Sequence, residues 1–313
     1  MLAAASLSRR DVLALAGGAA MLGSLPALGS GAAPDPEHPL IDAHSHVWSP
    51  DTTKWPLAGG KTKADLDPPS FTPEELLKLA HPERVGRVVL IQHHLYHSWD
   101  NSYLIDCAAR FPGVFAVTGM LDDAQPNPEK QMPSLLEKKV RGFRITSWIR
   151  KDKWLSGDGM AAMWKTGATT GQAMCCLINP EDLPGVSAMC AKHPETTVVI
   201  DHFARIGVDG QIRESDVKKL LALAKHKKVN VKLSAYYALG KKQEPYEDLL
   251  PMIRQVLTAF GPERCMWASD APYQTVQGHT YAASIALLRD RAGLSAGDKE
   301  HVFRKTAERI YFA

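Results

Sequence analysis

The chain has 313 residues, of which 45% are hydrophobic and 23% are charged, a composition typical of a globular protein with a packed core. This composition excludes a disordered or fibrous protein, and a chain of this length needs no disulfide or structural zinc for stability. The 37 lysines and arginines stand against 34 acidic residues and are scattered along the chain. Nucleic acid is therefore not an expected partner.

The N-terminus has the pattern of a twin-arginine export signal. Arg9 and Arg10 precede an apolar run rich in glycine and alanine, residues 12–28, which ends in small residues. The run is shorter than the ~20 strongly apolar residues of a membrane span, and glycines and a proline interrupt it. We expect residues 1–32 to be removed, leaving a periplasmic or secreted chain of residues 33–313 without a stable membrane span.

Eight short apolar runs typical of strands alternate with stretches of helical periodicity. The runs are Leu40–Ala43, Arg87–Gln92, Val114–Met120, Val140–Ile145, Ala173–Ile178, Thr197–Asp201, Val229–Leu233 and Cys265–Ser269. The helical stretches include Asn101–Arg110, Glu181–Lys192, Glu214–Lys228 and Tyr246–Phe260. This alternation predicts a (β/α)8 TIM barrel of the α/β class over residues 33–313, with residues 49–69 as a long loop. A doubly wound sheet is the alternative, but no glycine-rich phosphate motif follows the first run.

Five cysteines occur without the spacing of a metal or redox motif, and each lies in an apolar stretch. We expect them to be buried thiols, although the predicted compartment would permit a disulfide. They are Cys107, Cys175, Cys176, Cys190 and Cys265.

Two histidines mark the end of the first apolar run. His44 and His46 lie two positions apart, so on a strand their side chains share a face. The carboxyl ends of barrel strands form the rim where active sites of this fold lie. The pair therefore offers nitrogen ligands for a divalent metal, or two hydrogen bonds to a polarised group.

Polar residues also follow the other runs, and the barrel brings such strand ends to one rim. His202 and Asp270 are predicted to meet His44 and His46 there, since a carboxylate after a buried run needs a partner or a catalytic role. Asp201 faces the opposite side of its strand from His202, which predicts a structural role. The remaining rim candidates are His93, His94, Arg144 and Lys232.

These motifs together resemble the amidohydrolase superfamily, in the lactonase branch that includes 2-pyrone-4,6-dicarboxylate lactonase and sugar-acid lactonases. The resemblance extends over nearly all of residues 33–313, and its motifs are Ile41–Trp48, Asp100–Leu104, Arg141–Arg144, Ile200–His202 and Ser269–Tyr273. It implies that His44, His46 and His202 form a histidine cluster. It also implies that Asp270 is the acid/base for the hydrolytic water and that Arg144 is a cation that anchors the substrate.

Two departures from the family pattern limit the metal content. Relatives with two ions use a bridging Lys or Glu after the fourth strand and a histidine after the fifth, and this chain has neither. One divalent ion, with zinc expected, would be held by His44, His46, His202 and Asp270. A mechanism without metal, in which the cluster polarises the carbonyl directly, stays equally open.

The sequence thus predicts an exported hydrolase acting on a lactone or related ester of a small molecule that bears carboxylate or hydroxyl groups. Asp270 is the expected base, and His44, His46 and His202 stabilise charge on the carbonyl oxygen. Arg144, Lys232, His93 and His94 are the expected substrate-binding residues. The alternatives are a metal-dependent decarboxylase of an aromatic or unsaturated acid and a non-catalytic exported binding protein. The oligomeric state is not predicted.

Overall fold

The computed structural model describes residues 35–150 and 153–313. The predicted signal, residues 1–32, lies outside the described residues. Within the described part, no helix combines the length and the apolar character that a membrane crossing requires.

Eight parallel strands form one sheet in the order β1 to β8, each pairing with the next. They are β1 (Leu40–Ser45), β2 (Val85–Ile91), β3 (Phe115–Gly119), β4 (Val140–Ile145), β5 (Ala173–Cys176), β6 (Val198–Ile200), β7 (Val229–Leu233) and β8 (Cys265–Trp267). Every predicted run overlaps one of these strands, and the predicted (β/α)8 barrel is confirmed.

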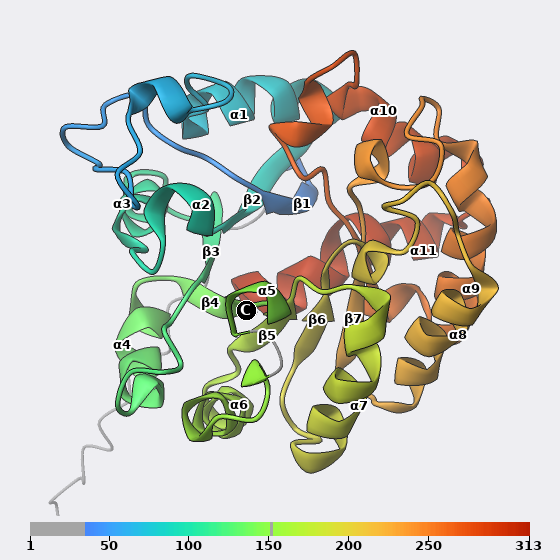
Figure 1. The fold of residues 1–313 in the computed structure, drawn as a ribbon. Coiled ribbons are helices and arrows are strands. Elements are labelled where there is room, and N and C mark those ends of the chain that lie inside the picture. The colour runs from blue at the N-terminus through green and yellow to red at the C-terminus, as the bar shows by residue number, and fades with distance from the viewer. Residues whose placement is uncertain (1–34, 151–152) are drawn as a thin grey trace, which may run out of the picture. The chain divides into compact units, whose positions relative to one another are not determined.

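Helices surround most of the ring of strands, and the short α5 (Ser147–Arg150) lies over its middle in the view of Figure 1. They are α1 (Pro73–Ala80), α2 (His94–His97), α3 (Ser102–Arg110), α4 (Met132–Glu137), α5 (Ser147–Arg150), α6 (Asp158–Thr170), α7 (Leu183–Lys192), α8 (Glu214–Leu221), α9 (Leu250–Phe260), α10 (Tyr281–Ala286) and α11 (Ala296–Glu300). The four helical stretches singled out in the sequence correspond to α3, α7, α8 and α9. The long loop at residues 49–69 contains a single 3-10 turn, Lys63–Asp65, and packs on α2 through hydrogen bonds to Tyr96.

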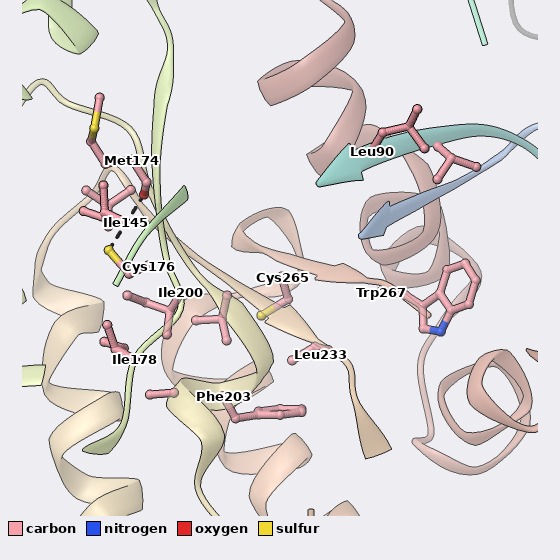
Figure 2. Packing of buried hydrophobic residues seen from close by; sticks show 14 of the residues in the cluster. Leu90, Ile145, Met174, Cys176, Ile178, Ile200, Phe203, Leu233, Cys265 and Trp267 are labelled. Atoms are coloured by element: carbon pink, nitrogen blue, oxygen red, sulfur yellow. Dashed lines mark hydrogen bonds between the residues drawn. The ribbon is translucent and has the colours of Figure 1, made fainter. Parts of the chain in front are cut away.

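The strands alternate between two apolar layers because successive side chains of a strand point to opposite faces. Alternate residues such as Val199, Met266 and Ala268 fill the barrel interior. Their neighbours belong to a larger cluster that also contains the helix residues, part of which Figure 2 shows with Ile200 and Trp267 among them. The five cysteines are buried and free, as predicted.

The last turns of the chain close the amino-terminal end of the barrel. Ala307, Ile310 and Tyr311 pack with the interior residues, and the chain end runs to the centre of the ring of strands (Figure 1). The Tyr311 hydroxyl lies 3.5 Å from the Sγ of Cys175 on β5. These residues therefore fill the amino-terminal end of the barrel interior, and the remaining space lies at the carboxyl ends of the strands.

Asp42 joins the first strand to the last. Its buried carboxylate accepts hydrogen bonds from the Ser269 backbone N–H (2.9 Å), the Ser269 hydroxyl (2.5 Å) and the Tyr281 hydroxyl (2.9 Å). A parallel bridge between Ser45 and Ala271 continues the contact. Burial raises the pKa of Asp42 to about 6, against the hydrogen bonds from Ser269 that lower it.

Candidate active site

A cavity of about 240 Å³ opens at the carboxyl ends of the strands. Five of the eight predicted site residues line it, and they come from five different strand ends: His46, His93, Arg144, His202 and Asp270. His44 is fully buried beneath the cavity and contacts this set. The structure thus brings together residues that are separated by more than two hundred positions in the sequence.

The carboxylate of Asp270 lies close to all three histidines of the predicted cluster. Its Oδ1 lies 3.4 Å from Nε2 of His44 and 3.5 Å from Nε2 of His46, and its Oδ2 lies 3.9 Å from Nε2 of His202. The side chain of Tyr237 donates a hydrogen bond of 2.8 Å to Oδ2. One carboxylate therefore contacts three imidazoles with its two oxygens, and only 5% of the residue is exposed.

Unusual backbone conformations direct two of these side chains. After β6 the chain makes a left-handed turn, with positive φ at each residue from His202 to Arg205. Asp270, beyond the end of β8, also has a positive φ of 65°. Non-glycine residues rarely adopt this region, and clusters of them occur at functional sites where the surrounding structure holds them.

Burial keeps the histidine cluster neutral. It lowers the pKa of His46 to about 3 and lowers the pKa values of His44 and His202 below the ordinary value of 6.5. Burial acts in the opposite direction on Asp270 and raises its pKa, while His202 and Tyr237 oppose that rise. Neutral imidazoles carry a lone pair that can bind a cation or accept a proton.

Asp201 and Lys232 form a buried ion pair behind His44. Their side chains are 3.1 Å apart, and the Lys232 Nζ lies 3.2 Å from Nδ1 of His44. Burial raises the pKa of Asp201, but the charge of Lys232, together with the contact to His44, outweighs this and holds the pKa of Asp201 well below its usual value. Both residues are fully buried, and neither lines the cavity.

The positions of these two residues correct the sequence interpretation. Lys232 was predicted to bind substrate, but a side chain with 0% exposure beneath His44 has no access to one. Asp201 was expected to face away from the site. It lies on the interior side of β6 with Val199, and His202 reaches the same site because the strand ends at Ile200 and the left-handed turn breaks the alternation.

The two histidines after β2 occupy different environments. His93 lines the cavity, and its Nε2 lies 2.6 Å from the hydroxyl of Tyr273. His94 begins α2, packs edge-on against Trp99 and is not among the residues that line the cavity. A helix that starts at the second histidine turns the two side chains in different directions, so His94 does not join the site it was predicted to join.

Three further polar residues line the cavity that sequence reasoning did not assign: Arg205, Tyr237 and Tyr273. Arg205 donates a hydrogen bond of 2.7 Å to Oδ1 of Asn179, and its guanidinium stacks on the exposed ring of Trp148. Arg205 lies three residues after His202 and Tyr273 three residues after Asp270. The short distance in sequence from a predicted site residue could therefore have indicated both Arg205 and Tyr273 as site residues.

The donor set fits one divalent cation. Nδ1 of His46 lies 2.9 Å from the Ile91 carbonyl, to which only an N–H can donate, so Nε2 carries the lone pair. That lone pair faces the Asp270 carboxylate at 3.5 Å, and two acceptors at this distance need a cation or a proton between them. Ligand atoms of His44, His46 and Asp270 all lie within 4.8 Å of one another, and the same holds for His44, Asp201 and His202. Two imidazoles and a carboxylate are ligands that zinc accepts.

The sequence profile of the Amidohydrolase family matches residues 41–313. The chain belongs to the amidohydrolase family. It is 30% identical over 283 residues to L-fucono-1,5-lactonase from Burkholderia ambifaria, covering 84% of this chain and 95% of that protein. It is 26% identical over 235 residues to 4-sulfomuconolactone hydrolase from Hydrogenophaga intermedia, covering 74% of each.

A solved structure of an amidohydrolase from Burkholderia multivorans with bound zinc matches with a TM-score of 0.70. It is 22% identical and covers 87% of this chain and 99% of that one, a likeness that shows the shared fold. The family assignment and the names of its relatives identify the chain as a hydrolase of the amidohydrolase family.

Proposed function

We propose that this hydrolase opens the lactone ring of a small molecule that carries a carboxylate or hydroxyl groups. The observation that carries the proposal is the buried Asp270 carboxylate, held by Tyr237 and set against three neutral histidines at the floor of a cavity. The relatives named as a lactonase and a lactone hydrolase support the choice of ester chemistry.

Asp270 is the base in this reaction. A water molecule in the cavity next to Asp270 gives its proton to the carboxylate as its oxygen attacks the acyl carbon. Tyr237 fixes Oδ2, so Oδ1 stays directed at the histidine cluster, where the attacked carbonyl has to lie. Burial raises the pKa of Asp270, which makes it a stronger base than an exposed aspartate.

The histidine cluster stabilises the negative charge that develops on the carbonyl oxygen, either through an N–H that faces this oxygen or, for the Nε2 lone pair of His46, through a cation that it would help to bind. A divalent ion, when bound by His44, His46 and Asp270, would supply Lewis-acid polarisation of that oxygen and acidify the attacking water. His202 is oriented by Ser234, whose Oγ lies 2.8 Å from its Nδ1, so its Nε2 faces the cavity and Asp270.

Two guanidinium groups provide an anchor for an anionic substituent. Arg144 and Arg205 line the same cavity, and the buried Nε of Arg144 has no hydrogen-bond partner among the described residues. Guanidinium groups bind carboxylates through paired N–H donors. A lactone that carries a carboxylate therefore fits this cavity better than a neutral one.

The test is turnover of a lactone panel by the purified protein, with metal content measured before and after chelation. Ring opening, together with one equivalent of a divalent metal whose removal abolishes activity, is the expected result. If activity persists with less than roughly a tenth of an equivalent of divalent metal per chain, the metal requirement is refuted. The lactonase proposal would not be affected by that result. Release of CO2 from aromatic acids would favour a decarboxylase, and tight binding without turnover would favour a binding protein.

The export signal is a second part of the proposal. We infer from Arg9, Arg10 and the apolar run that follows them that the chain is exported by the twin-arginine route. Mass spectrometry of the exported protein should then find a new N-terminus near Ala33. Retention of Met1 in the mature protein would refute cleavage and favour a tethered form.

A further inference from the structure

A tyrosine and a histidine form a second polar pair on the cavity wall. Nε2 of His93 lies 2.6 Å from the hydroxyl of Tyr273, and both residues line the cavity with Asp270. The Tyr273 ring is packed against the rings of His46 and Tyr237, at centroid distances of 5.8 and 6.4 Å. The hydroxyl is thus held in place beside the predicted base.

The surroundings of His93 indicate which group donates in this hydrogen bond. The residue is 8% exposed, and its Nδ1 is buried with no hydrogen-bond partner among the described residues. A neutral imidazole carries one proton, and a buried N–H without an acceptor is rarer in proteins than an acceptor without a donor. The proton therefore belongs on Nε2, which donates to the Tyr273 oxygen, and the tyrosine O–H is left free to donate into the cavity.

The other cavity tyrosine does not have this freedom. The Tyr237 hydroxyl donates to Oδ2 of Asp270 at 2.8 Å, so its proton is already engaged. In the part of the chain that the structure describes, Tyr273 is the hydroxyl on the cavity wall whose proton has no assigned acceptor. Lactone hydrolysis needs a proton donor when the C–O ring bond breaks, since the ring oxygen then gains a pair of electrons.

We propose that Tyr273 is the acid that protonates the leaving ring oxygen, and that His93 positions it and stabilises its phenolate. This inference rests on the proposed lactonase function and adds a catalytic residue to it. It also narrows the substrate class to lactones whose ring oxygen leaves as an alkoxide, because a poor leaving group gains most from a positioned acid.

The step balances in atoms and charge. Water adds to the acyl carbon and gives one proton to Asp270, and the C–O ring bond breaks with its electron pair moving to the ring oxygen. That oxygen takes the proton of Tyr273 and becomes the product hydroxyl. Asp270 then releases its proton to solvent and the phenolate takes one back, so one water is consumed for each lactone opened.

The experiment compares wild type and Tyr273→Phe on lactones and esters that share one acyl group and differ in leaving-group pKa. Loss of the hydroxyl should lower kcat by about 10²-fold for an alkoxide leaving group and by less than about threefold for a nitrophenolate, since general acids typically contribute about 10² to 10⁴. KM should stay nearly constant. An equal loss across the series would show a structural role and overturn the inference.

Two further variants keep the test decisive. His93→Leu leaves Tyr273 in place and should give the same dependence on leaving group, with no further loss when combined with Tyr273→Phe; additive losses would overturn the positioning role of His93. Tyr246→Phe is the matched control because Tyr246 is a buried tyrosine 2.8 Å from Nδ1 of His279 and does not line the cavity. Its kcat should match wild type for every leaving group.

The design separates this inference from the proposed function. If wild type hydrolyses no member of the series, the lactonase proposal fails, and the inference fails with it. If wild type is active and Tyr273→Phe shows an unchanged leaving-group dependence, only the assignment of Tyr273 is wrong.

Discussion

Replacing Asp270 with asparagine tests the base directly. Asparagine has the same shape, and its amide oxygen can still accept the hydrogen bond from Tyr237 that Oδ2 receives in wild type. Its amide N–H groups can face the Nε2 atoms of His44 and His46, which lie 3.4 and 3.5 Å from Oδ1. The variant therefore removes the proton acceptor while preserving the packing around it.

The expected loss follows from the role. General bases contribute about 10² to 10⁴ to the rate, so kcat should fall by at least roughly 100-fold. Each tenfold step corresponds to about 1.4 kcal/mol of barrier. The melting temperature of the metal-free protein should not fall, because burial raises the pKa of Asp270 and so disfavours the charged form at this position.

The assay is kcat and KM on the best lactone of the panel across pH 5 to 9, with metal content and melting temperature recorded in parallel. Asp209→Asn is the matched control, since Asp209 is an exposed aspartate paired with Arg213 on the surface. The reasoning is wrong if Asp270→Asn keeps kcat within about threefold of wild type with the same pH profile. His202 or His93 would then be the next candidate base.

Arg144→Met should raise KM for a carboxylate-bearing lactone by roughly tenfold or more with kcat little changed, because hydrogen bonds to charged groups contribute about 1.5 to 3 kcal/mol. An equal rise in KM for an uncharged analogue would exclude the anchoring role. Asp42 has a pKa of about 6 in the folded chain, above its ordinary 3.8, so its contribution to the free energy of unfolding is present below pH 3.8 and is lost as pH rises through about 6. When the free energy of unfolding is measured between pH 3.5 and 8, it should fall less with rising pH for Asp42→Asn than for wild type. Equal decreases would disprove the raised pKa of Asp42.

The barrel was predictable because eight short, mostly apolar runs alternate with stretches of helical periodicity. Runs such as Val140–Ile145 and Val229–Leu233 coincide with β4 and β7 at both ends. Strand ends are less certain where polar residues follow, so the predicted Thr197–Asp201 shortens to Val198–Ile200. Hydrophobic pattern marks where a strand is buried, whereas backbone geometry decides where it stops.

The same distinction explains the site. His44, His46, His202 and Asp270 were predictable because the barrel carries every strand end to one rim. The positions of Lys232 and Asp201 relative to the cavity were predicted wrongly. Both side chains are buried beneath the cavity because they form an ion pair between two strands, and no local sequence pattern encodes such a pair. Sequence reasoning also assumed that alternation continues past Ile200, where the left-handed turn at His202 breaks it.

The charge balance of the cavity limits what it can bind. The Lys232 ammonium and the Asp201 carboxylate neutralise each other beneath His44, and the histidines of the cluster are neutral. Two guanidinium groups, Arg144 and Arg205, then face a single carboxylate on the cavity wall. A bound divalent ion would increase this positive excess. Because unbalanced charge in a partly buried site is costly, this positive excess favours the anionic lactone that we propose as the substrate.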